Sequence, residues 1–454
     1  MAVVDRLIGF ASPAAALRRS IQLKDQGRLA EAFALLAVAA KAGIPDAEHR
    51  VARCYLEGSG VPPSRSEGAR WLERAAAHGC VEAQVLLSAL CVRGLVNVSS
   101  GRGDLTNRLF AGDAPAEPDF ESAQKWARDA ALAGSAEGQA LLAYTLTCGP
   151  ESMCDLEEAH SWYERSAAAG CPQGHLGLAL SLARRTPDER GRRQMADQLR
   201  LAAEADLPTA IYLLAVLTEQ GAGVKRDPVR AVELYRRAAE RGHRSAQVRW
   251  GIALLEGRNV EQDLVTGETW LRRAALAGDS QAATLMGDRC IRSGPLPPNY
   301  SEASNWYRRA AEAGHQAAAR ALASLYLTGA GVPQDKGEAA RLLRVAAETG
   351  DKASQVDLAN LVLRGAGDPE DSARIAGWFE EAAASGDLVA AFNLGVCLVK
   401  GVGVERDERQ AAAWLRHAAD GLPEAQIHVW AHAARGSRRG VRPQGGPHLV
   451  QTGG

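Results

Sequence analysis

Two pairs of side chains in this 454-residue sequence could bind a metal or react, one of histidines and one of cysteines. His428 and His432 lie four residues apart in a segment expected to be helical, a spacing that metal ligands use. No glutamate follows His428 and no third ligand is evident, so we expect two surface histidines rather than a metal site. Cys148 and Cys154 flank one expected connecting loop. We expect unpaired thiols there, and a redox or metal role for this pair is the alternative.

The sequence lacks the other arrangements that would support catalysis. The glycine-rich stretch SSGRGD at 99–104 has neither the preceding strand nor the following helix of a phosphate-binding loop. Its Arg-Gly-Asp tripeptide resembles a cell-adhesion signal, and we expect that match to be a coincidence. No Ser/His/Asp set and no pair of carboxylates repeats or clusters. We therefore predict that the protein is not an enzyme, with no catalytic residue, no metal, no cofactor and no small-molecule substrate.

A nine-residue motif recurs along the chain. It reads WLRRAALAG at 270–278, and close copies include WYERSAAAG at 162–170 and WYRRAAEAG at 306–314. We call the last residue of each copy its marker. The markers are Gly43, Gly79, Gly134, Gly170, Asp206, Gly242, Gly278, Gly314, Gly350, Gly386 and Gly421. Eight of the ten intervals between markers are 36 residues and the others are 55 and 35, so the chain is a tandem array of repeats.

Small side chains hold fixed positions relative to each marker. Alanine always lies three residues before the marker, and alanine, glycine or serine always lies four residues after it. Apolar residues then follow at helical intervals, as Ala210, Leu213 and Leu217 do. Glycines such as Gly221 and Gly223 end that helix. This pattern predicts an all-α fold, a right-handed α/α superhelical solenoid of about eleven 36-residue helix–turn–helix repeats, packed closely where the small residues lie.

The repeat resembles the Sel-one-like repeat, a 36-residue relative of the tetratricopeptide repeat. The family pattern, with its GxGV loop and its Trp, Ala-Ala and Gly positions, can be laid on 321–350 and 391–421, and the resemblance covers about 30–435. It implies a protein-interaction scaffold or adaptor without catalytic residues. The copy that ends at Asp206 departs from the pattern, because Gln198 replaces the tryptophan and the GxGV loop is missing. Some secreted members repeat cysteines in their units; the cysteines here show no such regularity, which indicates a reducing compartment.

Charge and hydropathy bear on partners and location. The formal net charge is −1 at pH 7 and the pI is near 6.8, so we expect no nucleic-acid partner. No apolar run approaches the roughly 20 residues that span a bilayer, and Asp5 and Arg6 interrupt the apolar stretch at the start. We therefore expect a cytoplasmic protein without a transmembrane segment. The alternative is an envelope-associated or periplasmic repeat protein that regulates polysaccharide export, signalling or host interaction, which the family also supplies.

The same patterns divide the chain into regions. Residues 1–42 are a lead-in and a first helix pair expected to cap the array. Residues 43–435 are the solenoid, with an insertion at about 93–119 that either docks its apolar residues on the solenoid or is a loop without function. Residues 436–454 are a basic Gly/Pro/Arg tail expected to be disordered. The basic connection at 184–193 is expected to be a solvated turn, with a phosphate or acidic-peptide contact as the alternative.

Partner-binding residues are expected on the first helix of each repeat, by analogy with tetratricopeptide arrays, where that helix lines the concave face. Positions six and ten after the marker lie off the packing stripe. The candidates at these positions are Tyr144, Leu180, Tyr212, Val248, Asp288, Arg320, Asn360 and Phe392. We expect them to line a groove for a peptide or helix of a protein partner of unknown identity. The alternative is that many of them pack on the adjacent first helix.

Overall fold

The computed structural model describes residues 12–95, 117–185, 188–292, 297–363, 369–422 and 425. In these ranges all regular structure is helical, with 22 α-helices, one 3-10 turn and no strand. The chain divides into two compact units, Met1–Arg241 and Gly242–Gly454, and each is described by itself. Most of the predicted insertion, the His428–His432 pair and the tail at 436–454 lie outside the described residues. No helix in the described ranges combines the length and apolarity that a bilayer crossing demands.

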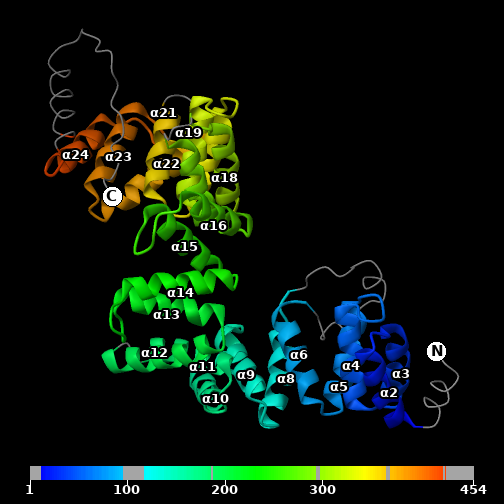
Figure 1. Cartoon of the computed structure of the whole chain (residues 1–454). Helices are drawn as coiled ribbons and strands as arrows, with labels where there is room; N and C mark the ends of the chain where they lie inside the picture. The colour runs from blue at the N-terminus through cyan, green and yellow to red at the C-terminus, as the bar shows by residue number, and fades with distance from the viewer. Residues whose placement is uncertain are drawn as a thin grey trace, which may run out of the picture. The chain divides into compact units, whose positions relative to one another are not determined.

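The first unit holds six helical hairpins. Their helices are α2 (Pro13–Asp25) and α3 (Leu29–Lys41), α4 (Pro45–Glu57) and α5 (Arg65–Ala77), α6 (Val81–Val92) and α8 (Phe120–Leu132), α9 (Ala136–Cys148) and α10 (Leu156–Ala168), α11 (Pro172–Arg185) and α12 (Glu189–Glu204), and α13 (Pro208–Gln220) and α14 (Pro228–Glu240) (Figure 1). The two helices of each hairpin pack together, and each second helix also packs on the first helix of the next hairpin of the unit. A short 3-10 turn, Glu151–Met153, lies between α9 and α10.

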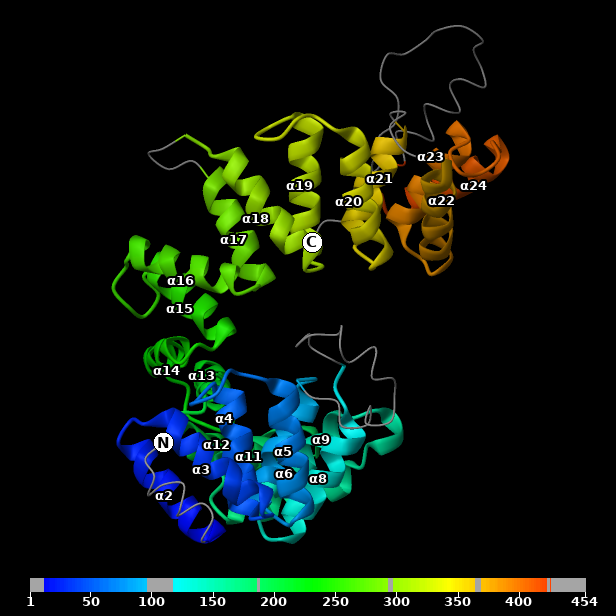
Figure 2. The same ribbon diagram turned by 90° about the vertical axis from the view of Figure 1, so that its right-hand side faces the viewer.

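The second unit holds five hairpins built in the same way. Their helices are α15 (Arg244–Glu256) and α16 (Leu264–Leu276), α17 (Ser280–Ile291) and α18 (Tyr300–Glu312), α19 (Gln316–Thr328) and α20 (Lys336–Glu348), α21 (Lys352–Leu363) and α22 (Pro369–Ala384), and α23 (Leu388–Lys400) and α24 (Glu408–Ala419). Helices α17 to α24 follow one another in chain order (Figure 2). The two units together contain eleven hairpins, which confirms the predicted all-α array of about eleven repeats.

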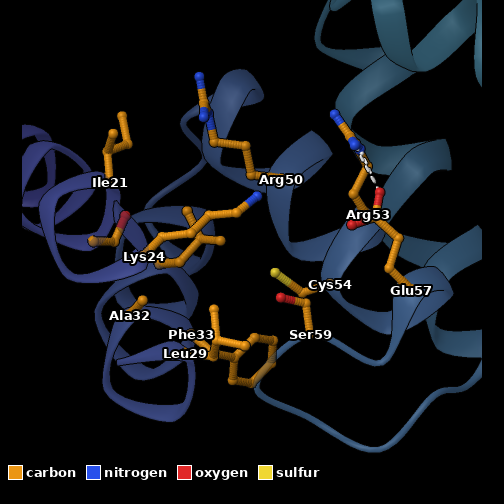
Figure 3. Close-up of a pocket in the computed structure, with 12 residues that line it drawn as sticks. Ile21, Lys24, Leu29, Ala32, Phe33, Arg50, Arg53, Cys54, Glu57 and Ser59 are labelled. Atoms are coloured by element: carbon orange, nitrogen blue, oxygen red, sulfur yellow. Dashed lines mark hydrogen bonds and ion pairs between the residues drawn. The ribbon is translucent and has the colours of Figure 1, made fainter. Parts of the chain in front are cut away.

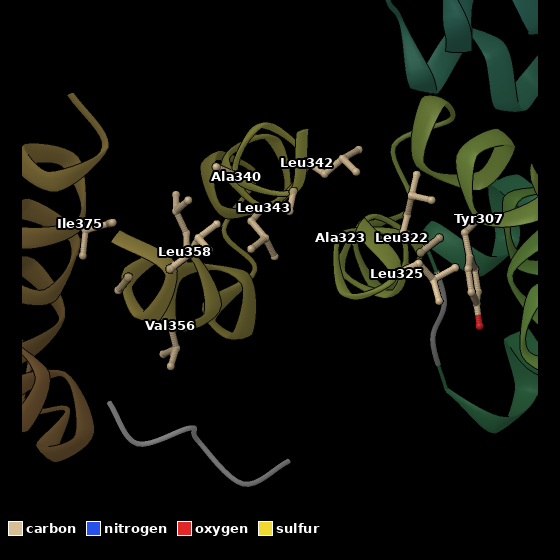
Figure 4. Packing of buried hydrophobic residues seen from close by; sticks show 14 of the residues in the cluster. Tyr307, Leu322, Ala323, Leu325, Ala340, Leu342, Leu343, Val356, Leu358 and Ile375 are labelled. Carbon is tan, nitrogen blue, oxygen red and sulfur yellow. The ribbon is translucent and has the colours of Figure 1, made fainter. Parts of the chain in front are cut away.

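One continuous apolar core runs through the second unit. Leu322 and Leu325 of α19 lie between Tyr307 of α18 and Leu343 of α20, and the core continues to Leu358 of α21 (Figure 4). Each hairpin therefore buries its apolar face only against its neighbours, as expected for repeats too short to form a core alone.

The small residues predicted at the helix crossings are buried. All eleven residues four positions after a marker are buried, and so are ten of the eleven alanines three positions before it; Ala311 is partly buried. The crossing of α8 and α9 shows why these side chains must be small. A Cβ atom at Gly138 would lie 2.7 Å from the Cβ of Ala130 and 3.0 Å from the backbone nitrogen of Ala131. The backbones approach so closely that each added carbon would force the helices apart.

A capping side chain lies at the start of most second helices, although α3 has none. In the sixth hairpin the Asp227 carboxylate accepts a hydrogen bond from the Arg230 amide (2.9 Å), and the Asp227 amide donates to the Thr218 carbonyl (2.9 Å). Asp119, which follows the predicted insertion, makes the same backbone bond to the Cys91 carbonyl (3.0 Å) and caps α8. The long connection therefore replaces a GxGV loop without changing the hairpin that carries it.

The second glycine of each GxGV loop lies against the preceding hairpin. Gly331 has φ +70°, and a Cβ atom there would overlap the backbone of Tyr300, the first residue of α18. Gly223 approaches the Arg192 carbonyl of α12 in the same way. These loops therefore need glycine for two reasons, a left-handed backbone and direct contact with the helix of the previous repeat.

The repeat that departs from the family pattern keeps its hairpin by other contacts. Its marker, Asp206, adopts φ 60°, a left-handed conformation that nine of the other ten markers reach with glycine. The Asp206 carboxylate is paired with Arg237 and Arg241, and Arg241 Nη2 lies 2.6 Å from Asp206 Oδ2. Arg237 also donates to the Ala203 carbonyl at the end of α12 (2.8 Å). An ion-paired aspartate thus occupies the position of the glycine.

Candidate functional site

Similar hollows occur at three places in the array. Each one lies between the two helices of a hairpin and the first helix of the next hairpin. We name them the N-terminal pocket (α2, α3 and α4), the α9–α11 groove (α9, α10 and α11) and the α19–α21 groove (α19, α20 and α21). The recurring geometry comes from the repeat, whereas the lining side chains differ from one hollow to the next.

The N-terminal pocket is small and has an apolar floor. Its volume is about 60 Å³, and Ile21, Phe33 and Leu36 contribute to its walls. The Lys24 side chain extends from α2 toward Arg50 and Cys54 of α4 (Figure 3). The other cations at the rim are already paired. Arg50 Nε lies 2.9 Å from Asp46 Oδ1, and Arg53 Nη2 lies 2.6 Å from Glu57 Oε1.

The α9–α11 groove is larger, at about 220 Å³, and mainly apolar. Tyr144 of α9 and Leu180 of α11 are each 42% exposed, and Leu156 of α10 is 52% exposed. Tyr163 forms the floor, where burial raises the pKa of its hydroxyl to about 12. Gly177 makes room for this ring, because a Cβ atom there would overlap it. The groove therefore brings together two of the predicted site residues, Tyr144 and Leu180.

The α19–α21 groove has a volume of about 480 Å³ and a more polar lining. Arg320 and Asn360, both predicted site residues, line it together with Ser324 and Lys336. The Arg320 Nε atom lies 3.2 Å from Asp357 Oδ2, so its charge is already compensated. The lining offers hydrogen-bond donors and acceptors rather than a large apolar surface, which suits a polar peptide segment.

Four predicted site residues lie outside these two grooves. Tyr212 is half-buried with its ring centroid 5.8 Å from that of Tyr235. Asp288 accepts a hydrogen bond from the Tyr307 hydroxyl (2.7 Å) and thereby joins α17 to α18. Val248 is 3% exposed and Phe392 is 1% exposed, and both belong to the core of the second unit. The side chain six residues after the marker therefore points into the core in these two repeats. Neither Val248 nor Phe392 is part of the proposed binding surface.

Residues of the second helices also line the grooves, whereas the predicted site residues all lie on first helices. Leu156 and Tyr163 belong to α10, and Lys336 belongs to α20. Leu156 and Lys336 each follow directly after a capping aspartate, Asp155 and Asp335. An apolar or charged residue just after the cap is therefore a sequence signal for the groove wall.

The histidines that follow two markers cap helices. Their Nδ1 atoms accept hydrogen bonds from the Ala246 amide (3.2 Å, His243) and the Ala318 amide (3.3 Å, His315). They thus cap the N-terminal ends of α15 and α19. In the described part of the chain, no cluster of three or more His, Cys, Asp or Glu side chains could hold a metal ion.

The cap at His243 makes stability depend on pH. Burial lowers the pKa of His243 below its ordinary 6.5, because a site shielded from water disfavours the charged ring. The unfolded state therefore binds more protons, so the stabilisation is complete above pH 6.5 and falls as the pH drops toward the lower folded pKa. We expect His243→Asn, which keeps a cap without titrating, to reduce the loss of stability between pH 7.5 and pH 5.5. Urea unfolding at both pH values measures this; an unchanged loss would contradict the cap's role.

The cysteines differ widely in accessibility. All eight are free; Cys148 and Cys154 are exposed, whereas Cys91 and Cys397 are buried. Burial raises the pKa of Cys91 and Cys397 to about 12. Because the thiolate is the reactive form, we expect iodoacetamide to modify Cys148 and Cys154 quickly in the native protein, and Cys91 and Cys397 only in denaturant. Peptide mass spectrometry over time measures each rate; fast native labelling of Cys397 would show that the second unit opens.

The Sel1 repeat family matches the chain at residues 45–80, 107–135, 136–171, 208–243, 244–279, 280–315, 316–351, 352–387 and 388–421. These segments make up more than half of the sequence, and the chain belongs to the Sel1 repeat family. Sel1 solenoids are typically protein-interaction scaffolds and generally non-catalytic. The matches omit the hairpin of α2 and α3 and the hairpin of α11 and α12, which ends at Asp206.

Several solved structures are similar to this chain, and two of them are described here. One is c5321, a protective antigen present in uropathogenic Escherichia coli strains that displays an SLR fold; it is 27% identical, the match covers 89% of this chain and 83% of that chain, and the TM-score is 0.55. The other is a Sel1 repeat protein from Oxalobacter formigenes, which is 27% identical over 70% of this chain and 88% of that chain, with a TM-score of 0.48. No curated protein matches the sequence.

Proposed function

We propose that this protein is a non-catalytic interaction scaffold that binds segments of partner proteins in the hollows along its first helices. The observation that carries the proposal is the α9–α11 groove, where Tyr144, Leu156 and Leu180 leave apolar surface exposed in a concave setting. Apolar surface of this kind is costly in water and marks interaction sites. A peptide or a helix would cover it with its own apolar side chains.

The differences among the hollows support a scaffold with more than one kind of contact. The α9–α11 groove is apolar, whereas the α19–α21 groove presents Arg320, Ser324 and Asn360. Partner recognition along a solenoid adds up over repeats, so dissimilar hollows give selectivity for one partner sequence. A cytoplasmic location is part of the same proposal. The eight unbonded cysteines support it, because thiols stay reduced there.

Affinity capture with paired variants tests the proposal. We expect Tyr144→Asp with Leu180→Asp to reduce recovered partners at least tenfold by quantitative mass spectrometry, because charge in an apolar groove opposes docking. The matched control is Leu132→Asp on α8, which changes a more exposed leucine (71%) on a second helix. Circular dichroism verifies that all variants stay helical. Equal recovery with the groove variant and the control would refute the groove as the binding surface.

A further inference from the structure

We infer that the α9–α11 groove recognises an acidic peptide segment with apolar anchor residues. This inference rests on the proposed function and names the chemistry of the partner at that groove. It depends on three features of the described residues: the apolar walls, the arginines at one end, and the balance of charge around those arginines.

The apolar walls determine the anchor. Tyr144, Leu156 and Leu180 project from three different helices around the floor formed by Tyr163. A volume of about 220 Å³ accommodates one or two aliphatic or aromatic side chains rather than a folded domain. Burial of such a side chain removes apolar surface from water and so can anchor a short segment.

Two arginines close one end of the groove. Arg184 and Arg185 occupy the last turn of α11 and line the groove. Arg185 is paired with Glu157, a residue of the opposite wall. Arg184 has no ion-pair partner in the ranges that the structure describes, and it is exposed. One guanidinium at the groove is therefore available to a carboxylate, which it binds with planar, two-point geometry.

The sequence that follows Arg184 and Arg185 is also rich in arginine. Exposed arginines continue into the first turn of α12, at Arg190, Arg192 and Arg193. Glu189 is the acidic residue nearest to two of them, at 3.6 Å from Arg192 and 3.4 Å from Arg193. The segment 184–193 contains five arginines against Asp188 and Glu189, and Glu157 and Glu164 of α10 both act on Arg185. These residues together retain a small positive excess, although the whole chain is nearly neutral.

Charge and apolar surface together select the occupant. A basic segment would place like charges beside Arg184, and a neutral apolar segment would leave that arginine without a partner. Nucleic acid would require a longer row of uncompensated cations, whereas apolar walls cover most of this groove. A protein segment in which Asp or Glu accompanies Leu, Phe or Tyr satisfies both the walls and the charge.

Selection from a library of random 12-residue peptides displayed on phage tests this inference with the full chain. We expect enriched peptides to combine acidic residues with a large apolar residue. Their affinity for the Arg184→Glu chain should fall at least tenfold, and that chain should no longer select acidic sequences. The matched control is Arg18→Glu, which reverses an exposed arginine on α2.

The outcomes separate this inference from the proposed function. Peptides that lose binding to Leu180→Asp but bind the Arg184→Glu chain as before would refute the acidic partner and leave the scaffold intact. Enrichment of basic or uncharged peptides would likewise overturn the inference. If no peptide is enriched above background, both the inference and the proposed binding groove are contradicted. The same holds if the enriched peptides bind the Leu180→Asp and Arg184→Glu chains as tightly as the unaltered chain.

Discussion

Replacing Gly331 by alanine is expected to lower the free energy of unfolding by about 2–5 kcal/mol. Gly331 has φ +70°, and a left-handed backbone costs an alanine roughly 1–2 kcal/mol. The added methyl group would also overlap the backbone of Tyr300, where no flexible side chain can yield. Overpacking of this kind typically adds about 1–3 kcal/mol. The loop would then separate from the first turn of α18.

The comparison variant for Gly331→Ala is Gly314→Ala. Gly314 has a similar φ of +82°, but no atom lies within 4 Å of the position that its Cβ would occupy. Alanine at this position would have the same left-handed backbone strain but no steric overlap. The free energy of unfolding should therefore fall by only ~1–2 kcal/mol. Urea unfolding followed by circular dichroism compares the two variants. Equal decreases in the free energy of unfolding would show that contact between the GxGV loop and the preceding hairpin does not stabilise the protein.

Replacing Ala131 by leucine is expected to cost about 1–3 kcal/mol. Ala131 is 3% exposed at the crossing of α8 with α9, where Gly138 already has no room for a single methyl group. Three further carbons would push the two hairpins apart and loosen the apolar core on both sides. Thermal unfolding of the full chain measures the loss.

Ala133→Leu is the matched control for the crossing, because it makes the same change two residues further along at an exposed position. It should change stability by less than ~0.5 kcal/mol. A large loss at Ala133, or none at Ala131, would contradict the view that hairpins stack through small side chains.

Most of the architecture was predictable from the sequence because residues of the same type recur at fixed intervals in the repeats. The marker interval predicts the hairpins, and the helix pair expected within residues 1–42 is formed by α2 and α3. The repeat that ends at Asp206 was also recognisable, because its alanines keep their register. What the sequence did not reveal is how that repeat replaces its glycine, since the arginines paired with Asp206 lie 31 and 35 residues away.

The binding surface was less predictable, because a helix position does not say how deeply a neighbour covers it. Position six is half-buried at Arg320 yet fully buried at Phe392, since residues 391–398 of α23 are buried around the whole helix. Position ten predicts the open surface better, as Tyr144 and Leu180 show. Leu156 was missed because the prediction considered first helices alone, although the capping Asp155 before it marks the start of the second helix.

Site-specific photo-crosslinking tests the central claim most directly. A benzoylphenylalanine is placed at Leu180 in the α9–α11 groove and, in a second protein, at Leu132 on α8, which is more exposed but lies outside the groove. If partners bind along the first helices, irradiation in cells should yield protein adducts from position 180 and few from position 132. Adducts from position 132 alone, or equal yields from both positions, would contradict the account.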